Sequence, residues 1–472
     1  MSELFPAETL APLQNPASKD KGLLSNDAKS TGDPSFIDRV REAGIVGAGG
    51  AGFPAHVKLD AKTEYLIANG AECEPLLRSD RRIMERYAPG IVRAMKAAAV
   101  HTGAEKLVIA TKSHYEGAVE ALKKATAGTD IRLHLMKSTY PSGDEQTLVY
   151  DVTGRVVPTG GLPLDVRTVV SNVATLVNIA AALDGKPVTD KIITVSGAVK
   201  NPLTLEVPIG TPIGAVIEAA GGFESGNPGD YEIILGGPLM GFLAKTLDEP
   251  VTKTTGGILP LPRGHKLIGY KRVNITRQAK LAKAVCCQCS VCTQLCPRAA
   301  LGLGVSPHKA MRSLAAERGA LLGNFNSLFS CCDCGLCTYY ACNFGLSPSV
   351  VMGNFKKALM DQGIKPRKET AGPADPGMAG KKVPLSRLLS RLGLSKYDRD
   401  APLAPFTVPV PAVTIPLKMH IGGPCRPVVE KGAALKKGTV IGRPQGLGAV
   451  IHASVNGRVT EVTADHVVIR AE

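Results

Sequence analysis

The chain has 472 residues, 44% of them hydrophobic, which is too long for one compact core and predicts two to four domains. No apolar run approaches the roughly 18 residues that cross a bilayer, and the N-terminus lacks a secretory pattern, so we expect a cytoplasmic protein without a membrane span. The net charge of +15 comes from scattered Lys and Arg without a motif that reads nucleic acid. This argues against nucleic-acid binding and favours attraction of anionic partners.

The first part of the chain is predicted to be an α/β domain preceded by a flexible extension. Residues 1–34 mix Pro, Ser, Asp and Lys without periodicity, which is typical of disorder. After a short helix at about 36–43, strand-like and helix-like runs alternate at 65–68, 83–100, 107–110 and 116–125. That alternation predicts a mainly parallel sheet with helices over residues 35–185.

Two further segments are predicted to be rich in strands. Residues 190–265 contain three strand-like runs and a single helix at 212–220, which indicates a small β-grasp-like domain. Residues 412–472 are rich in Val, Ile and Gly and contain turn pairs such as Asn456-Gly457, which predicts a compact all-β module.

The stretch 363–411, rich in Pro, Gly and Lys, is predicted to be a linker that contains one amphipathic helix. Four leucines within it are spaced i, i+3, i+4 and i+7, so they form one apolar helical stripe: Leu385, Leu388, Leu389 and Leu392. Two interpretations remain open at this point. The helix either docks on the protein's own surface, which we favour, or binds a partner such as a shell protein.

Ten of the twelve cysteines lie in residues 275–362 among helical patterns. In a cytoplasmic protein this favours metal ligation or redox chemistry over disulfides. The pattern C-x2-C-x2-C-x3-C-P is followed 45 residues later by C-x2-C-x2-C-x4-C; the eight candidate ligands are Cys286, Cys289, Cys292, Cys296, Cys331, Cys334, Cys337 and Cys342. Soft thiolates at this spacing indicate two [4Fe–4S] clusters in a helical ferredoxin-like domain.

The fourth cysteine of each motif is expected to ligate the cluster of the other motif, as is usual in two-cluster ferredoxins. Cys342 would therefore complete the first motif's cluster, and Cys296 the second's. Two zinc sites are the alternative, although zinc more often uses two separated CxxC pairs. Cys287 and Cys332 break the x2 spacing and are expected to be packed bystanders.

A glycine-rich loop, Gly47-Ala-Gly-Gly-Ala-Gly-Phe-Pro54, lies between the first predicted helix and the first strand. It formally matches the GxGxxG fingerprint, with Glu72 twenty residues beyond Gly52, but a Rossmann loop would follow a strand and open a helix. Four glycines in six positions favour close approach of the backbone to a flat or phosphorylated ligand. A purely structural glycine turn is the alternative.

The loop, Lys58 and the segment Asn69-Gly-Ala-Glu-Cys-Glu-Pro75 resemble the flavin site of the NADH-oxidising subunit of respiratory complex I, and more closely the RnfC protein of the Rnf complex. Tyr140-Pro-Ser-Gly-Asp-Glu145 and Ser171–Leu176 match two further segments of that site. The resemblance implies a cofactor-binding set for FMN and NADH made of Gly47, Gly49, Gly50, Gly52, Phe53, Lys58, Asn69, Glu72, Glu74, Tyr140, Gly143, Asp144, Glu145 and Asn172. Within it, Phe53, Glu74 and Glu145 would lie near the nicotinamide nucleotide. Ala61 and Ala71 replace an aromatic residue and an Asp of the complex I relatives, which predicts altered NADH binding.

Residues 412–462 resemble the barrel-sandwich module that opens the RnfC protein, but here the module closes the chain. That order, with the two cysteine motifs, is similar to the cobalamin reductases of propanediol-utilisation microcompartments. The implied fold is multidomain α/β, in which an FMN/NADH-binding α/β domain is followed by a β-grasp domain of the soluble-ligand-binding (SLBB) type, a helical two-cluster ferredoxin domain and a C-terminal barrel-sandwich hybrid.

By this resemblance the chain is expected to be an oxidoreductase that passes electrons from NADH through FMN and two [4Fe–4S] clusters to cobalamin. No catalytic acid or base is required. Other acceptors, such as a flavodoxin, a ferredoxin or a radical-enzyme activase, are alternatives, and so is a non-catalytic conduit fixed in a shell or complex. The implied location is a bacterial microcompartment, where a shell protein and a cobalamin adenosyltransferase are candidate partners.

Overall fold

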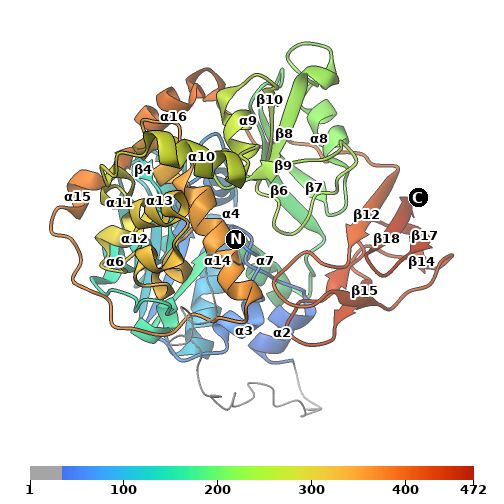
Figure 1. The fold of residues 1–472 in the computed structure, drawn as a ribbon. Coiled ribbons are helices and arrows are strands. Elements are labelled where there is room, and N and C mark those ends of the chain that lie inside the picture. The colour runs from blue at the N-terminus through green and yellow to red at the C-terminus, as the bar shows by residue number, and fades with distance from the viewer. Residues whose placement is uncertain (1–33) are drawn as a thin grey trace. The chain divides into compact units, whose positions relative to one another are not determined.

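The computed structural model describes residues 34–472, so the predicted extension lies outside the described residues except for Pro34. These residues form two compact units (Figure 1). The larger comprises residues 35–153, 166–271 and 384–472, and the smaller comprises residues 154–165 and 272–383. Within the described part of the chain, no helix is both long and apolar enough to cross a membrane.

The larger unit begins with the predicted α/β domain. Its elements are α2 (Phe36–Glu42), α3 (Ala55–Leu59), β1 (Tyr65–Gly70), α4 (Ser79–Thr102), β2 (Lys106–Lys112), α5 (Glu116–Thr126), β3 (Arg132–Met136), β4 (Thr139–Tyr140), α6 (Glu145–Thr153), β5 (Thr168–Asn172) and α7 (Val173–Leu183). The sheet has the order β3-β2-β1-β5 and all three pairings are parallel, as predicted. Leu66, Ile67 and Ala68 of the central strand β1 are fully buried, which explains why this strand is a continuous apolar run.

A five-stranded sheet forms the β-grasp domain of the larger unit. Its elements are β6 (Asp190–Val195), β7 (Leu203–Pro208), α8 (Ile213–Ala219), the 3-10 helix η4 (Pro228–Asp230), β8 (Tyr231–Leu235), β9 (Phe242–Leu243), β10 (Gly257–Pro262) and α9 (Lys266–Lys271), and the strand order is β7-β6-β10-β8-β9. Val216 and Ile217 of α8 pack on the sheet, in agreement with the predicted single helix among strands. Strand β10 was not predicted because it contains Pro260 and Pro262. The structure tolerates these prolines because β10 pairs with β6 only at Gly257 and Ile258.

The C-terminal module consists of two small sheets. Its strands are β12 (Ala412–Pro416), β13 (Cys425–Pro427), β14 (Ala434–Leu435), β15 (Val440–Pro444), β16 (Ile451–His452), β17 (Gly457–Val462) and β18 (His466–Ala471), in the orders β12-β18-β17-β14 and β13-β15-β16. Val413, Ile415 and Ile469 of this module belong to the same apolar core as Val40 and Ile45 beside the glycine-rich loop. The module therefore supports the α/β domain directly.

Residues 384–411 pack closely within the larger unit. They contain α16 (Leu385–Leu392) and the 3-10 helix η8 (Ser395–Tyr397). Leu388, Leu389 and Leu392 are buried, so the leucine stripe docks on the protein itself, as the favoured interpretation predicted. Residues after η8 contact both preceding domains. The backbone N–H of Thr204 in the β-grasp domain donates to the Pro402 carbonyl, and Arg82 in the α/β domain forms an ion pair with Asp400.

Leu388→Ala is expected to lower the free energy of unfolding by about 2–4 kcal/mol, because the side chain is fully buried and its removal leaves a cavity. The exposed neighbour Arg387 offers a matched control on the same helix. Arg387→Ala is expected to change the value by less than about 0.5 kcal/mol. Urea unfolding of both variants tests this; equal, small effects would show that the leucine stripe is not docked.

The smaller unit is mainly helical (Figure 1, yellow to orange). Its elements are η3 (Pro163–Val166, which ends at the boundary of the unit), α10 (Ile275–Val285), α11 (Val291–Gln294), α12 (Pro297–Ala300), α13 (Pro307–Ala316), η5 (Gly319–Leu322), η6 (Asn326–Ser330), the π-helical turn η7 (Cys337–Ala341), α14 (Pro348–Asp361), α15 (Met378–Lys381) and β11 (Val383–Pro384, also at the boundary). Helix α13 ends at Ala316, because Glu317 adopts a left-handed conformation, and a 3-10 turn follows. Thr159 and Glu369 exchange two backbone hydrogen bonds, which tie the 154–165 segment to this unit.

Candidate functional site

The glycine-rich loop forms a tight turn between α2 and α3. It is closed by a hydrogen bond from the Gly47 N–H to the Phe53 carbonyl at 2.9 Å. Ala48 anchors it from below, since its N–H donates to Thr175 Oγ1 at 2.9 Å and its carbonyl accepts from the buried Lys191 Nζ at 2.8 Å. A helix precedes the turn, so it is not a Rossmann loop, as expected from the sequence.

Two glycines at the tip of the loop leave the backbone accessible. A Cβ on Gly49 would lie 2.7 Å from Asn172 Nδ2, so Gly49 packs against the side chain that caps α7. A Cβ on Gly50 would meet no atom within 4 Å. The exposed backbone of Gly49 and Gly50 thus presents an open surface that a flat ligand could occupy.

Gly52 joins the loop to the C-terminal module. Its φ of +76° is a left-handed conformation, and an added Cβ would lie 2.8 Å from Thr254 Cγ2 and 3.2 Å from His420 Cα. The N–H of Ile421 donates to the Gly52 carbonyl at 3.2 Å. Phe53 follows with 37% of its surface exposed. The barrel-sandwich module therefore holds one side of the loop in place.

The charged residues predicted beside the loop come together in a partly exposed ion pair. Lys58 on α3 donates from Nζ to Glu145 Oε1, at the start of α6, at 2.5 Å. About a third of each side chain is exposed, so both groups remain accessible to a ligand. Asp144 precedes Glu145 and caps α6 by accepting from the Thr147 N–H at 3.1 Å.

The carboxyl end of β1 is fastened to the segment that contains Gly143. Asn69 Nδ2 donates to the Gly143 carbonyl at 2.9 Å, and Asn69 Oδ1 accepts from the Ala71 N–H at 3.1 Å. The Gly143 N–H approaches Cys73 Sγ to 2.6 Å. Three of the predicted cofactor segments, at 47–58, 69–75 and 140–145, therefore meet at one edge of the parallel sheet, where ligands of open α/β sheets bind.

A partly buried network of charged groups lies next to this edge. Glu72 Oε2 accepts from the Asp80 N–H at 2.7 Å, and Asp80 Oδ2 accepts from Asn172 Nδ2 at 2.8 Å. Burial, then the Asp80 charge, raises the pKa of Glu72 to about 8, and burial raises the pKa of Asp80 to about 6. Lys112 donates to the Glu72 carbonyl at 2.8 Å, and burial lowers its pKa. Burial also lowers the pKa of Lys191 to about 8.

The contribution of Glu72 to the stability of the protein is expected to fall as pH rises from about 4.5 to 8, and Glu72→Gln is expected to remove that part of the pH dependence. The folded state raises the pKa of Glu72, so it keeps a proton that the unfolded chain releases above about pH 4.5; the resulting stability is lost as pH passes through the folded value. The contribution of Glu72 to the free energy of unfolding should fall by on the order of 3 kcal/mol between pH 5 and 8, as measured by urea unfolding. Glu120, exposed on α5, provides the control. If Glu120→Gln and Glu72→Gln change the pH dependence equally, Glu72 is not the group responsible.

Glu74, which the resemblance places near the nicotinamide nucleotide, contacts the β-grasp domain. Both carboxylate oxygens accept backbone N–H groups of the β-grasp domain, from Leu239 at 2.8 Å and Met240 at 3.1 Å, and the Tyr140 hydroxyl donates to it at 3.3 Å. Burial raises its pKa. Lys271 Nζ donates to the Leu239 carbonyl at 2.6 Å. In this structure Glu74 and Tyr140 thus fix the β-grasp domain to the α/β domain.

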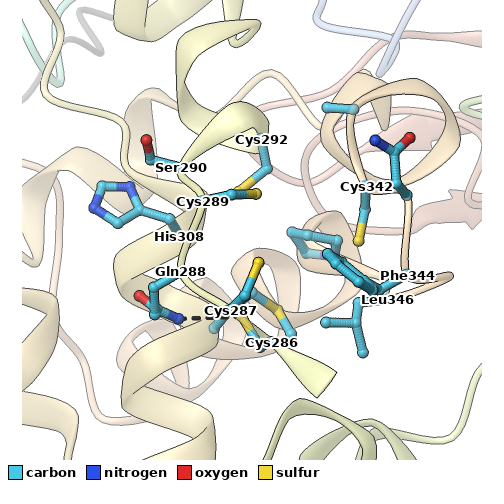
Figure 2. Close-up of a pocket in the computed structure, with 14 residues that line it drawn as sticks. Cys286, Cys287, Gln288, Cys289, Ser290, Cys292, His308, Cys342, Phe344 and Leu346 are labelled. Atoms are coloured by element: carbon cyan, nitrogen blue, oxygen red, sulfur yellow. Dashed lines mark hydrogen bonds between the residues drawn. The ribbon is translucent and has the colours of Figure 1, made fainter.

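In the smaller unit, cysteines from both motifs line one pocket. Cys286, Cys289 and Cys292 lie on one side, and Cys342 of the second motif faces them across the cavity (Figure 2). Burial, then the neighbouring Cys342, Cys289 and Cys286, raises the pKa of the Cys292 thiol to about 12. In the described part of the chain no group of three or more His, Cys, Asp or Glu side chains could hold a single metal ion, so four thiols around one pocket suit a larger cuboidal cluster better than one ion.

The remaining four predicted ligands form a second group. Burial raises the pKa of the Cys337 thiol, and the next contributions come from Cys331 and Cys296. Cys334 is buried and interacts with Cys332 and Cys296. Cys296 of the first motif is therefore close to the second motif. Cys332 lies among these thiols, whereas its counterpart Cys287 is exposed.

The two motifs repeat one local conformation. The second and fourth residues after the first cysteine have positive φ in each motif; they are Gln288, Ser290, Asp333 and Gly335. Thr293, which follows Cys292, accepts the His308 N–H at the start of α13, and Thr338, which follows Cys337, accepts the Ser349 N–H at the start of α14. This repeated turn points successive thiols to one side, which suits a cuboidal cluster.

The sequence matches four known domain families. Residues 40–181 match the Nuo51 FMN-binding domain, residues 192–243 the SLBB domain, residues 285–347 a 4Fe–4S dicluster domain and residues 395–471 the RnfC barrel sandwich hybrid domain. The predicted fold class is confirmed. The last match begins within the stretch predicted to be a linker.

Two relatives match nearly the whole chain. Cobalamin reductase PduS of Citrobacter freundii is 40% identical over 92% of this chain and 95% of its own, and that of Salmonella typhimurium is 41% identical over the same shares. The chain belongs to the cobalamin reductase PduS family. One component of the Na(+)-translocating ferredoxin:NAD(+) oxidoreductase complex of Acetobacterium woodii is 39% identical over 58% of this chain and 63% of its own. The predicted class, an oxidoreductase with FMN-binding and 4Fe–4S domains, is thereby confirmed.

The sequence reasoning missed the polar residues beneath the loop, namely Asp80, Lys112 and Lys191. Each lies in an ordinary helix or strand pattern, and no short motif joins them. One signal was present: Asp80 stands in the first turn of a long helix that follows directly after the Glu72–Pro75 segment. A carboxylate is favoured in the first turn of a helix by the helix dipole, and in the structure it accepts from Asn172 Nδ2.

Proposed function

We propose that this chain is a cobalamin reductase that takes electrons from NADH and delivers them to cobalamin through FMN and two [4Fe–4S] clusters. The observation that carries the proposal is the combination, within one chain of this family, of an open glycine cradle and two groups of four thiols. When bound, FMN accepts a hydride and releases electrons singly, which the one-electron clusters require.

The flavin would lie against the open backbone of Gly49 and Gly50. Lys58 would place a positive charge near the phosphate or the reduced ring. Its ammonium group pairs with Glu145 but stays about one third exposed, so it can still face a ligand. Asn69, Asp144 and Asn172 offer amide and carboxylate groups for the ribityl chain. Glu72 would act indirectly. Its carboxylate accepts from the Asp80 N–H, and the Asp80 carboxylate in turn accepts from Asn172 Nδ2 and fixes the position of that side chain.

The clusters would be held by crossed ligand sets. Cys286, Cys289, Cys292 and Cys342 would bind one cluster, and Cys296, Cys331, Cys334 and Cys337 would bind the other. The pocket that contains the first four thiols supports this assignment. The closeness of Cys296 to the second motif supports the other half.

NADH would bind at the exposed side of the loop, near Phe53 and Glu145. Glu74 is occupied by the β-grasp domain, so its contribution would be to position the neighbouring segment. Ala61 and Ala71 supply no polar or aromatic group to the nucleotide. We therefore propose weaker NADH binding than in the complex I relatives.

The family also suggests where the protein works. Its relatives are cobalamin reductases named PduS. We propose that this chain acts in a propanediol-utilisation microcompartment, beside a cobalamin adenosyltransferase that consumes the reduced cobalamin and near a shell protein. Co-purification of tagged chain with purified microcompartments tests the location; exclusion from them would contradict it.

The function is tested by anaerobic purification, determination of iron, sulfide and flavin, and rapid mixing with NADH with and without cobalamin. About eight iron atoms and one FMN per chain are expected, following from two four-iron clusters. Flavin bleaching by NADH should precede cluster reduction, and steady NADH oxidation should depend on cobalamin. Zinc in place of iron, or a flavin that NADH does not bleach, would overturn the proposal.

A further inference from the structure

The first cysteine group lies close to an exposed face, whereas the second does not. Cys287 and Cys289 are exposed, and Phe344, at the mouth of the same pocket, has 52% of its surface exposed (Figure 2). In the second group, Cys334 and Cys337 are buried. Electron exchange with another molecule requires close approach, so the first group offers the more accessible contact.

Helix α10 extends this face and leads directly into Cys286. Leu281 and Val285 are one turn apart on its outer side and are both exposed. Arg277 and Lys280 are also exposed, and Lys280 lies about 9 Å along the helix axis from Cys286. An apolar patch next to the thiols is thus bordered by basic side chains, which is the arrangement of a protein–protein contact with a polar rim.

The charge of the iron–sulfur module is strongly one-sided. Residues 275–362 contain nine basic and three acidic residues, a net charge of +6. Each acidic residue is already paired with a lysine of the same module, in the pairs Lys283–Glu317, Lys356–Asp333 and Lys357–Asp361. The module therefore has no carboxylate left to neutralise Arg277 and Lys280. Two bound [4Fe–4S] clusters, each of charge about −2 with its thiolates, reduce the net charge of the module but leave it positive.

We propose that this face, formed by Arg277, Lys280, Leu281, Val285 and Phe344, docks an acidic protein that carries a one-electron acceptor. The proposal rests on the electron path of the proposed function and adds a second exit for electrons, to a docked protein, beside the direct reduction of cobalamin. One electron passes at each encounter, so the iron–sulfur module loses one electron, the partner's centre gains one, and two encounters dispose of one hydride. Complementary charges would speed association and orient the partner, while the apolar centre excludes water.

Binding to an acidic flavodoxin, a one-electron carrier protein, tests the proposal on the holoprotein. The dissociation constant is measured by calorimetry at low and moderate salt. It is expected to rise about tenfold or more between 20 and 300 mM NaCl, because exposed charges are screened. Amidation of the flavodoxin carboxylates should abolish binding at low salt.

The double variant Arg277→Glu/Lys280→Glu should weaken binding at low salt by about tenfold or more. The matched control Lys186→Glu/Lys200→Glu reverses two exposed lysines outside the module and should change binding by less than about twofold. Absence of low-salt binding, or equal weakening by both pairs, would overturn the proposal. Self-association of the wild type that only the first variant abolishes would also overturn it, since a second copy would then cover the face.

Flavin bleaching by NADH in the Arg277→Glu/Lys280→Glu variant separates this inference from the proposed function. The rate should equal that of the wild type, because neither residue belongs to the flavin domain. A failed docking test with normal bleaching would overturn the docking surface alone. A wild type that NADH does not bleach would overturn the proposed function instead.

Discussion

Replacing Cys286 and Cys342 together by alanine is expected to remove one iron–sulfur cluster and leave the other, so that iron falls from about eight to about four atoms per chain. The reason is spatial: the two residues are far apart in sequence but line the same pocket. Both substitutions therefore damage one site. Iron and sulfide analysis, together with the electron paramagnetic resonance spectrum of the reduced protein, measures the loss.

The comparison variant keeps the Cys286 substitution and replaces Cys296 in place of Cys342. Cys286→Ala/Cys296→Ala removes one ligand from each proposed crossed set, so both clusters should be lost and iron should approach zero. If each motif instead held its own cluster with its own four cysteines, the two results would be interchanged. The pair of variants thus decides between crossed and local ligation without reference to activity, and far-ultraviolet circular dichroism of both reports whether the remaining fold is intact.

The parts of the fold that could be predicted are those whose signal is local. Strands β1 and β2 are buried on both sides, so a continuous apolar run marks each of them. The leucine stripe of α16 has a helical period and buries three leucines. Strand β10 gave no such signal, because prolines are normally absent from inner strands. The strand can contain Pro260 and Pro262 because its pairing with β6 is confined to its first two residues.

The candidate site was only partly predictable, since its polar floor is assembled from distant segments. Asp80 begins α4, Lys112 ends β2 and Lys191 lies in β6, yet all three surround Glu72 or the glycine-rich loop. Lys112 and Lys191 are buried and Asp80 is partly buried, and nothing in the local sequence indicates this. Burial follows only from how the β-grasp domain and the parallel sheet pack, which is a tertiary property.

Glu74 illustrates the same limit for a residue that the resemblance did single out. Its neighbours along the chain indicate a cofactor segment, but its actual hydrogen-bond partners, Leu239 and Met240, come from a loop 165 residues later. A Cβ on Gly237 would lie 2.1 Å from Glu74 Cγ, so only glycine fits at this position of the loop beside the carboxylate. The position of Glu74 is thus set by domain packing.

Gly50→Ala is expected to weaken FMN binding by about tenfold or more while leaving the cofactor-free fold as stable as before. The added methyl group would meet no protein atom within 4 Å, and the φ of Gly50 is not left-handed, so the backbone accepts alanine without strain. The methyl group would occupy the space where a flat ring is proposed to lie. Flavin fluorescence titration of the cofactor-free protein measures the affinity, and urea unfolding measures the stability.

Two neighbouring experiments make the Gly50 result specific. Gly226→Ala adds a methyl group at another open glycine, in the β-grasp domain, and should change neither quantity. Gly49→Ala would bring a carbon to 2.7 Å from Asn172 Nδ2, so it should lower stability as well as affinity. A Gly50→Ala protein with the affinity of the wild type would show that the flavin does not rest on the tip of the loop. Loss of affinity without loss of stability places the ligand there, because the methyl group has nothing else to displace.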